Sequence, residues 1–390
     1  GITVFQNLST IPRSVIFWRA FTQWIGGLGI LSMFILLGFK GGTAANKLFL
    51  AESHKISTKK PSPGLFQTAR VLWATYGFLT ILQIGLLYIL GVDLFDGLTH
   101  SFTTISTGGF SMYDESIAFY RLNGYENYVL IELTYILFML FGGMNFFIHF
   151  RVSKGDVKAL WDNTEIRYFR NIIFGSTALI LIVYFVKNTI SYQVGGVESV
   201  AGIEGFLLHL KDTLFQVVSI ITTTGFGTRD INLPYFTQFA KQIFLILMVV
   251  GGCAGSTAGG VKVIRVAILF KLVKTRLFKL NSKHLSRVPL SIDGKIVKPE
   301  EINRISTIFF TWLLLLIFGG TITAIFSDLS AWSSFSGAFS ALGNIGPCYI
   351  SVPAMANLAG PIKVTYILSM LAGRLEILPL LIIFSSRFYR

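Results

Sequence analysis

Charged side chains are scarce in this 390-residue sequence, because only 13% of its residues are Asp, Glu, Lys or Arg. A soluble domain usually contains about a quarter of such residues. Cysteine is nearly absent as well: the sequence holds Cys253 and Cys348, and two cysteines cannot make a disulfide framework. Each lies in or beside an apolar segment, which favours a packing role over a redox role. The composition therefore excludes an ordinary soluble domain and a disulfide-rich secreted domain.

Several catalytic signatures are missing too. The sequence contains no H-E-x-x-H motif, no G-x-S-x-G motif, and no cluster of His or Cys at the spacing of metal ligands. The phosphate-binding pattern G-x-x-x-x-G-K-[ST] is also absent. A membrane-embedded enzyme is therefore not supported, and we expect neither enzyme activity nor an organic cofactor.

Hydrophobic residues, in contrast, make up 53% of the chain, and its mean hydropathy is +0.65. Several apolar runs reach the roughly 20 residues that cross a bilayer, so we expect an all-α polytopic membrane protein. The expected spanning helices are 14–38, 66–91, 127–150, 169–187, 236–270, 303–327 and 362–386. Shorter apolar stretches at 93–105, 205–221 and 330–342 cannot span. Each is expected to be a re-entrant helix, or alternatively a buried or interfacial one.

Basic residues are sorted by segment, although the net charge of +14 alone would suggest nucleic acid. Segments 39–65, 151–170 and 271–300 are rich in Lys and Arg. The intervening segments 92–126, 188–235 and 328–361 contain only Arg121, Lys211 and Arg229. The positive-inside rule places the first set in the cytoplasm and the short apolar stretches on the outer side. We therefore expect contact with membrane lipids and no nucleic-acid partner. Acidic residues in the outer segments could form a negative vestibule or simply be solvated.

Three polar loops follow the short apolar stretches. They read TTISTGGFS (103–111), ITTTGFGT (221–228) and ALGNIGPCY (341–349). When the loops are aligned on Gly108, Gly225 and Gly346, these glycines are separated by 117 and 121 residues. Gly1 lies a further 107 residues before Gly108, so we expect the chain to begin inside a fourth copy without its outer helix and pore helix. One glycine usually marks a turn or close packing, but the recurring set indicates an internal repeat.

Loops of this composition suit a pore for a bare cation. K⁺ must exchange its water for other oxygens in a narrow pore, and backbone carbonyls can supply them. Glycine permits the extended or left-handed backbone that turns carbonyls inward, and a helix C-terminus presents a negative dipole end. The predicted ion-binding residues are Gly1, Ile2, Thr3, Ser106, Thr107, Gly108, Thr223, Thr224, Gly225, Asn344, Ile345 and Gly346. The transported K⁺ is expected at the carbonyls of Thr107, Gly108, Thr224, Gly225, Ile345 and Gly346.

A set of motifs along the whole chain carries a family resemblance. They are FWRAFTQWIGGLGI (17–30), STGGF (106–110), TTTGFGT (222–228), GGCAGSTAGGVKVIRV (251–266), GNIGP (343–347) and GRLEILPLL (373–381). With them the sequence resembles the ion-translocating subunits of the Trk/Ktr/HKT potassium transporters, most closely those of the TrkH type. The resemblance implies four non-identical helix–pore-helix–helix units around a pseudo-fourfold central pore.

The expected units follow from this resemblance. They are 1–65 (the second half of unit 1, with its inner helix and cytoplasmic loop), 66–168 (unit 2), 169–300 (unit 3) and 301–390 (unit 4). The sequence departs from the family pattern in its truncated first unit and in Asn344-Ile345-Gly346-Pro347, where the other loops have Thr or Ser. The choice between K⁺ and Na⁺ therefore stays open.

Small residues interrupt the long apolar run 236–270. They form either a helix-packing face or, as the resemblance implies, a flexible loop at 251–260 that blocks the pore below the filter. The predicted gating residues are Gly255, Ser256, Thr257, Ala258, Gly259, Gly260, Lys262 and Arg374. Arg374 is expected in the middle of span 362–386, where a charge is costly. It is expected to face the pore and tune conduction, or else to snorkel or bind a backbone carbonyl.

The favoured function is potassium uptake through a channel-like pore, with the pore loops facing outside in a bacterial cytoplasmic (inner) membrane. The resemblance implies a homodimer and a TrkA-type cytoplasmic regulatory subunit, on which alone a nucleotide is expected. The alternative is a secondary transporter of another monovalent cation, coupled to Na⁺ or H⁺. Such transporters often show inverted repeats, whereas the repeats here keep one orientation.

Overall fold

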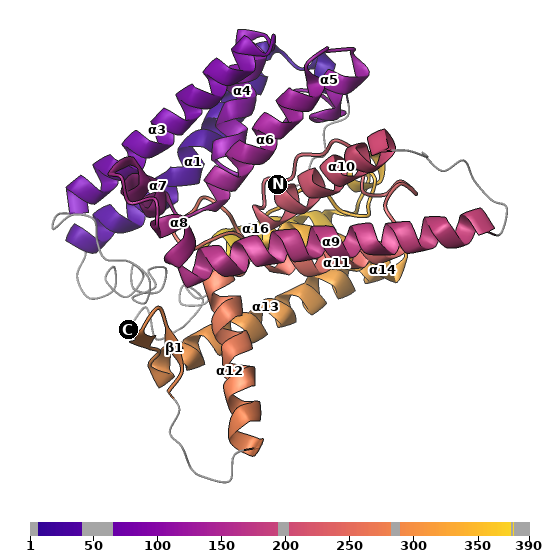
Figure 1. The fold of residues 1–390 in the computed structure, drawn as a ribbon. Coiled ribbons are helices and arrows are strands. Elements are labelled where there is room, and N and C mark those ends of the chain that lie inside the picture. Colours follow the sequence, from indigo (N-terminus) through magenta and orange to yellow (C-terminus); the bar gives the residue numbers. More distant parts are fainter. Residues whose placement is uncertain (1–6, 41–64, 194–202, 282–288, 376, 378–390) are drawn as a thin grey trace.

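The computed structural model describes residues 7–40, 65–193, 203–281, 289–375 and 377, and these residues are mostly helical. The helices are Leu8–Thr10 (η1, a 3₁₀ turn), Arg13–Lys40 (α1), Leu65–Ile89 (α3), Leu94–Ile105 (α4), Ala118–Leu122 (α5), Tyr128–Gly143 (α6), Phe146–Ser153 (α7), Ala159–Asp162 (α8), Thr164–Gln193 (α9), Ile203–Ile221 (α10), Gln238–Val249 (α11), Val263–Asn281 (α12), Pro299–Ile325 (α13), Ala331–Gly343 (α14), Val352–Ala356 (α15) and Gly360–Arg374 (α16) (Figure 1). A short hairpin of Ser291–Ile292 (β1) and Lys295–Ile296 (β2) lies between α12 and α13.

Three described helices are long and apolar enough to cross a membrane. They include Ala69–Ile89 of α3, Thr164–Lys187 of α9 and Pro299–Ile325. A fourth candidate is the pair α6 and α7, which is bent by 103°. The predicted continuous helix 127–150 is therefore wrong. The chain leaves the helix at Met144, whose backbone is extended, and the Asn145 side chain accepts a hydrogen bond from Phe147 N to start α7.

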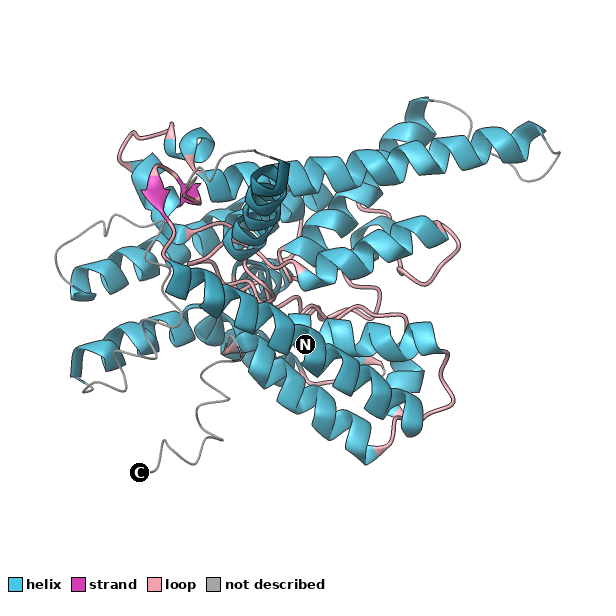
Figure 2. Cartoon of the chain, turned by 90° about the horizontal axis from the view of Figure 1, so that it is seen from below, coloured by secondary structure: helices cyan, strands magenta, loops and turns pink. Residues whose placement is uncertain are grey.

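The three short helices that the sequence predicted are present as α4, α10 and α14. Each packs between three other helices: α4 against α1, α3 and α6, α10 against α6, α9 and α11, and α14 against α11, α13 and α16. Asp93 and Ser330 begin α4 and α14, because their side chains accept hydrogen bonds from the first-turn N–H groups of Phe95 and Ser333. The C-terminal ends of these helices lead directly into the glycine loops. Figure 2 shows loops gathered at the centre of the molecule, between the helices.

The span expected at 14–38 is present as the helix α1, and two further expected spans differ from the prediction within the described residues. The run 236–270 is broken, as expected, because α11 ends at Val249 and α12 begins at Val263. The span expected at 362–386 is described as α16, which ends at Arg374. Arg374 is thus the last residue of a helix and not its middle. Ile377, with a φ of 63°, donates its N–H to Ala372 O, a bond that turns the chain out of the helix.

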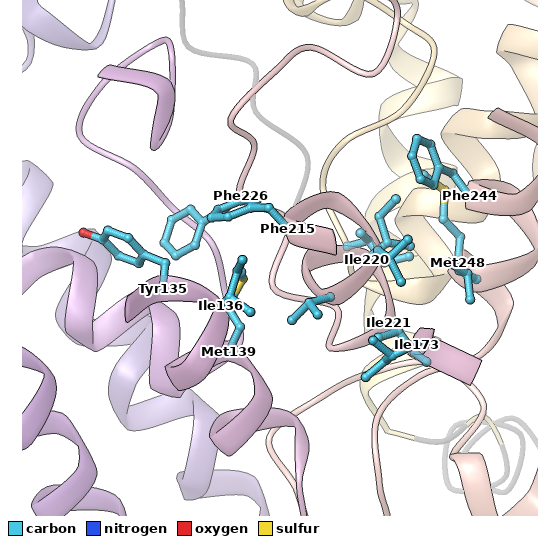
Figure 3. Packing of buried hydrophobic residues seen from close by; sticks show 14 of the residues in the cluster. Tyr135, Ile136, Met139, Ile173, Phe215, Ile220, Ile221, Phe226, Phe244 and Met248 are labelled. Carbon is cyan, nitrogen blue, oxygen red and sulfur yellow. The ribbon is translucent and has the colours of Figure 1, made fainter. Parts of the chain in front are cut away.

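The largest hydrophobic cluster fixes α10 in place. Phe215 and Phe226 lie beside Tyr135 and Met139 of α6, while Ile221 reaches Ile173 of α9 (Figure 3). The rings of Tyr135 and Phe226 are 5.6 Å apart at an edge-to-face angle. Phe226 belongs to the glycine loop after α10, so this core anchors the loop as well as the helix.

Candidate pore site

The three glycine loops share one unusual backbone conformation. Each first residue after the helical turn is left-handed, although it is not glycine: Thr107, Thr223 and Asn344 have φ of 50°, 55° and 58°. Two positions later the glycines Gly109, Gly225 and Gly346 have φ of 68°, 86° and 112°. Residues other than Gly, Asn and Asp adopt such backbone angles only at a cost in free energy. Three occurrences at equivalent places therefore indicate a repeated structural requirement.

Backbone hydrogen bonds define the register of the repeat. The N–H groups of Gly108, Thr224 and Ile345 donate to the carbonyls of Thr103, Ser219 and Ser340, at 2.8, 2.9 and 3.1 Å. Gly108 is therefore equivalent to Thr224 and Ile345, and Gly109 is equivalent to Gly225 and Gly346. The alignment on Gly108 is wrong by one residue. The pair Gly108-Gly109 hides the register in the sequence, since either glycine could supply the positive φ.

The loops contact one another in chain order. A Cβ built on Gly109 would lie 1.7 Å from the carbonyl oxygen of Thr224. A Cβ built on Gly225 would lie 1.8 Å from the carbonyl oxygen of Ile345. The same contact thus joins loop 103–111 to loop 221–228, and loop 221–228 to loop 341–349. This is expected for segments arranged around a common axis. Gly1, Ile2 and Thr3, which were expected in the first loop, lie outside the described residues.

One cavity of about 920 Å³ is lined by all three loops. Gly109, Gly225 and Gly346 all line it. Its charged lining residues are Asp114, Glu115, Asp230, Arg19, Arg121 and Arg229. The lining therefore has equal numbers of acidic and basic groups among the described residues, and the negative vestibule suggested by the sequence is not found there.

Gln23 of α1 also contacts a glycine loop and was missed in the sequence. Its Nε2 donates to Gly108 O at 3.0 Å, and Phe110 N donates to its Oε1 at 3.4 Å. One side chain thus binds the backbone on both sides of Gly109. The available signal was a polar amide inside an apolar helix, because a buried amide needs hydrogen-bond partners.

Segment 250–262, called the intramembrane loop below, lies against the C-terminal ends of the short helices. Thr257 Oγ1 donates to Ile105 O at 2.9 Å, at the end of α4. Gly259 N donates to Thr223 Oγ1 at 2.7 Å, and a Cβ on Gly259 would meet Gly343 O at 2.7 Å. Thr107 Oγ1 also donates to Thr257 Oγ1 at 3.2 Å. The loop therefore touches the point where α4, α10 and α14 converge.

The predicted gating residues form most of this loop. Gly255 and Gly260 have φ of 73° and 68°, and a Cβ on Gly251 would lie 1.8 Å from Gly259 O, so the loop doubles back on itself. Ser256 Oγ donates to Cys253 O at 2.6 Å and accepts from Ala258 N at 3.3 Å. The alternative of a helix-packing face is wrong, because residues 251–262 are not helical.

Two cationic side chains bind carbonyls of the intramembrane loop. Lys262 Nζ donates to Ala258 O. Arg374 donates through Nη1 to Thr257 O and through Nη2 to Gly27 O of α1, at 2.9 Å for the latter. Arg374 therefore binds backbone carbonyls, which was one of the alternatives for it, and it links α16, α1 and the loop.

A buried ionic network binds the glycine loop 221–228. Asp212 of α10 is fully buried, and its Oδ2 accepts from Arg229 Nε at 2.7 Å. Arg121 Nη1 lies 3.4 Å from the same oxygen. Lys211 bridges Asp212 and Glu132 of α6. Burial lowers the pKa of Arg229, but the hydrogen bond and the charge of Asp212 outweigh it, so the pKa of Arg229 is raised.

A mostly helical membrane protein whose glycine-turn loops meet at one cavity belongs to the class of membrane transport proteins. The chain is a member of the TrkH family, described as cation transport protein, which matches residues 1–389. It is 32% identical to the Trk system potassium uptake protein TrkH of Escherichia coli (strain K12) over 393 residues, which cover all of this chain and 77% of the relative. It is 30% identical to the TrkG protein of the same organism, with 76% of that relative covered.

A solved structure agrees with this assignment. The crystal structure of the potassium transporter TrkH from Vibrio parahaemolyticus matches with a TM-score of 0.76 and 29% sequence identity, over all of this chain and 76% of that one. The predicted family and the predicted all-α membrane fold are confirmed. The family consists of transporters and is not an enzyme family.

Proposed function

We propose that this chain takes up K⁺ across a bacterial cytoplasmic membrane through a channel-like pore. The observation that carries the proposal is the left-handed residue followed by a left-handed glycine, repeated in three loops that line one cavity. The names of the relatives, potassium uptake proteins, support K⁺ as the transported ion. The four units 1–65, 66–168, 169–300 and 301–390 would supply one quarter of the filter each.

The register of the loops assigns the proposed ion ligands. Carbonyls at equivalent positions, those of Gly108, Thr224 and Ile345, would form one ring around the ion, and Thr107, Thr223 and Asn344 another. Gly109, Gly225 and Gly346 would complete the outer end, with Ser106 preceding the filter on the inner side. Gly1, Ile2 and Thr3 would supply the first quarter. The amide of Asn344 donates to Met370 O at 3.0 Å, so its side chain binds α16 and leaves its backbone to the filter.

Rubidium uptake tests the function directly. The intact protein, expressed in bacterial cells that lack their own potassium uptake systems, should restore growth at low potassium and take up rubidium in proportion to membrane potential. A tenfold excess of K⁺ should suppress the uptake, whereas the same excess of Na⁺ should not. Suppression by Na⁺ alone, or uptake that requires a Na⁺ or H⁺ gradient, would favour a secondary transporter of another monovalent cation.

The intramembrane loop is proposed as a gate, with Gly255, Ser256, Thr257, Ala258, Gly259, Gly260, Lys262 and Arg374 as its working residues. Its contacts with Ile105 O, Thr223 Oγ1 and the carbonyl of Gly343 support this role, because these groups adjoin the proposed filter residues. A TrkA-type cytoplasmic subunit carrying the nucleotide would move it. A homodimer in contact with membrane lipids, with the glycine loops outside, completes the proposed assembly.

Weakening the loop should raise flux. Gly259→Ala forces a methyl group against Gly343 O, and Arg374→Gln removes the charge that binds Thr257 O, so both should open the gate. We expect rubidium flux to rise about tenfold, which corresponds to the loss of one or two hydrogen bonds. The matched control is Gly85→Ala in α3, whose methyl group meets no atom within 4 Å. A third variant replaces residues 256–259 by two glycines. Unchanged rubidium flux in all three variants would show that the loop is not a gate.

A further inference from the structure

Besides its contacts with α6 and α7, the intramembrane loop binds a buried carboxyl group through Ala254. The N–H of Ala254 donates to Glu165 Oε1 at 2.7 Å. Glu165 is the second residue of α9 and is fully buried. Lys262 and Arg265 act on the same carboxyl group electrostatically. The function proposed above does not use Glu165.

The hairpin of β1 and β2 shares a hydrophobic cluster with the same residue. Asp293 and Gly294 form its two-residue turn, with φ of 48° and 75°, the left-handed pair that favours Asp-Gly in tight hairpins (Figure 2). Leu290, Ile292 and Val297 are buried beneath it. They join Ala254, Ile264, Ile268 and Ile305 in one hydrophobic cluster. The methyl group of Ala254 therefore packs in the cluster that the hairpin covers, while its N–H binds Glu165.

The hairpin is also tied to the helix that carries Glu165. Asp293 Oδ1 accepts from Thr164 N at 3.1 Å and from Thr164 Oγ1. Thr164 is the first residue of α9, so Asp293 satisfies an N–H group that the helix leaves open. Hairpin, helix start and loop thus form a closed set of contacts: Asp293 to Thr164, Glu165 to Ala254, and Ala254 to the hairpin cluster.

We propose that Glu165 is a positioning residue that, together with the hairpin 290–297, latches the intramembrane loop at Ala254 in its blocking position. The proposal rests on the gating function proposed above and assigns the residues that hold the closed state. Movement of the loop would break the hydrogen bond from Ala254 N to the Glu165 carboxyl group and leave that buried group without it. The open state is therefore higher in free energy than the closed state. Movement of the hairpin would change the same bond through Thr164. The latch lies on the predicted cytoplasmic side, because α9 begins beside the basic segment 151–170.

The position of the loop can be measured independently of transport. Cys253 adjoins Ala254 and is fully buried, so it reports loop movement as a rate of thiol modification. In the intact protein with Cys348→Ala, a water-soluble methanethiosulfonate should modify Cys253 about tenfold faster in Glu165→Gln than in the parent. Asp293→Asn preserves the turn, since Asn also tolerates positive φ, and should give a smaller increase in the same direction. The control Glu300→Gln alters an exposed acid of the same region and should leave the rate unchanged.

Rubidium flux in the same variants separates the latch from the gate. Faster modification of Cys253 together with higher flux supports both. Faster modification with unchanged flux supports the latch and overturns the gate. Unchanged modification in both Glu165→Gln and Asp293→Asn, with protein in the membrane at parental levels, overturns the latch whatever trimming of the loop does. Modification that rises equally in Glu300→Gln also overturns it, because the effect would then not depend on Ala254.

Discussion

Gly225→Ala should reduce rubidium uptake to the background of cells without the protein. At Gly225 the backbone has a φ of 86°, and a Cβ would lie 1.8 Å from Ile345 O, far inside the contact distance. Strain at a left-handed position costs about 1–2 kcal/mol, but the overlap with a backbone carbonyl cannot be relieved by a rotamer change. The loop must move, and with it the carbonyls proposed to bind the ion. Uptake per protein in the membrane measures the effect.

Gly124→Ala is the matched control for this substitution. Gly124 lies in the loop between α5 and α6 with a φ of 73°, and its Cβ would meet no atom within 4 Å. The substitution introduces the same kind of backbone strain without the overlap, so uptake should stay near the parental value. Equal loss in the two variants would show that strain alone is responsible and would contradict the close packing of adjacent loops.

The register of the second loop can be decided in the same assay. Gly109→Ala should abolish uptake as Gly225→Ala does, because its Cβ would lie 1.7 Å from Thr224 O. At Gly108 the nearest atoms belong to the end of the Gln23 side chain, which can move. A smaller loss in Gly108→Ala than in Gly109→Ala is therefore expected, and the opposite order would restore the alignment on Gly108.

The short helices and the broken run could be predicted from sequence because both depend on local composition. A stretch such as 93–105 is too short to span whatever surrounds it, and the glycines of 251–260 weaken any helix. The bend between α6 and α7 was missed because hydropathy reports burial and not direction. The polar Asn145, which caps α7, was the local signal for it.

Other features could not be predicted because they depend on which charged side chains the fold brings together. The sequence shows that Asp114 and Arg19 exist, but only the fold places acids and bases in one cavity and cancels the expected negative charge. The hairpin, in contrast, was predictable: Ser-Ile-Asp-Gly-Lys-Ile contains an Asp-Gly turn between short apolar alternations. The basic residues of the surrounding segment 271–300 dominate its composition and obscure this short hairpin pattern.

Asp212→Ala should destabilise the protein by about 3–5 kcal/mol, the typical cost of removing one partner from a buried ion pair. Asp212 is fully buried, and Arg229, Arg121 and Lys211 surround it. Tyr235 also donates to its Oδ2, at 3.0 Å. Without the carboxylate these cations remain close together, and Glu132, which faces them from α6, already binds Lys211. Thermal unfolding of the detergent-solubilised protein measures the loss.

Two further variants distinguish the network from a general effect of removing an outer acid. Asp230→Ala changes an exposed residue of the same loop and should alter the free energy of unfolding by less than about 0.5 kcal/mol. Asp212→Asn keeps an acceptor for Arg229 but loses the charge, so its stability should fall between those of the parent and Asp212→Ala.

Arg121 also donates to Thr228 O at 2.5 Å, three residues after Gly225. Loss of Asp212 should therefore lower rubidium uptake even below the unfolding temperature, and parental melting with parental uptake would show that the filter does not depend on this network.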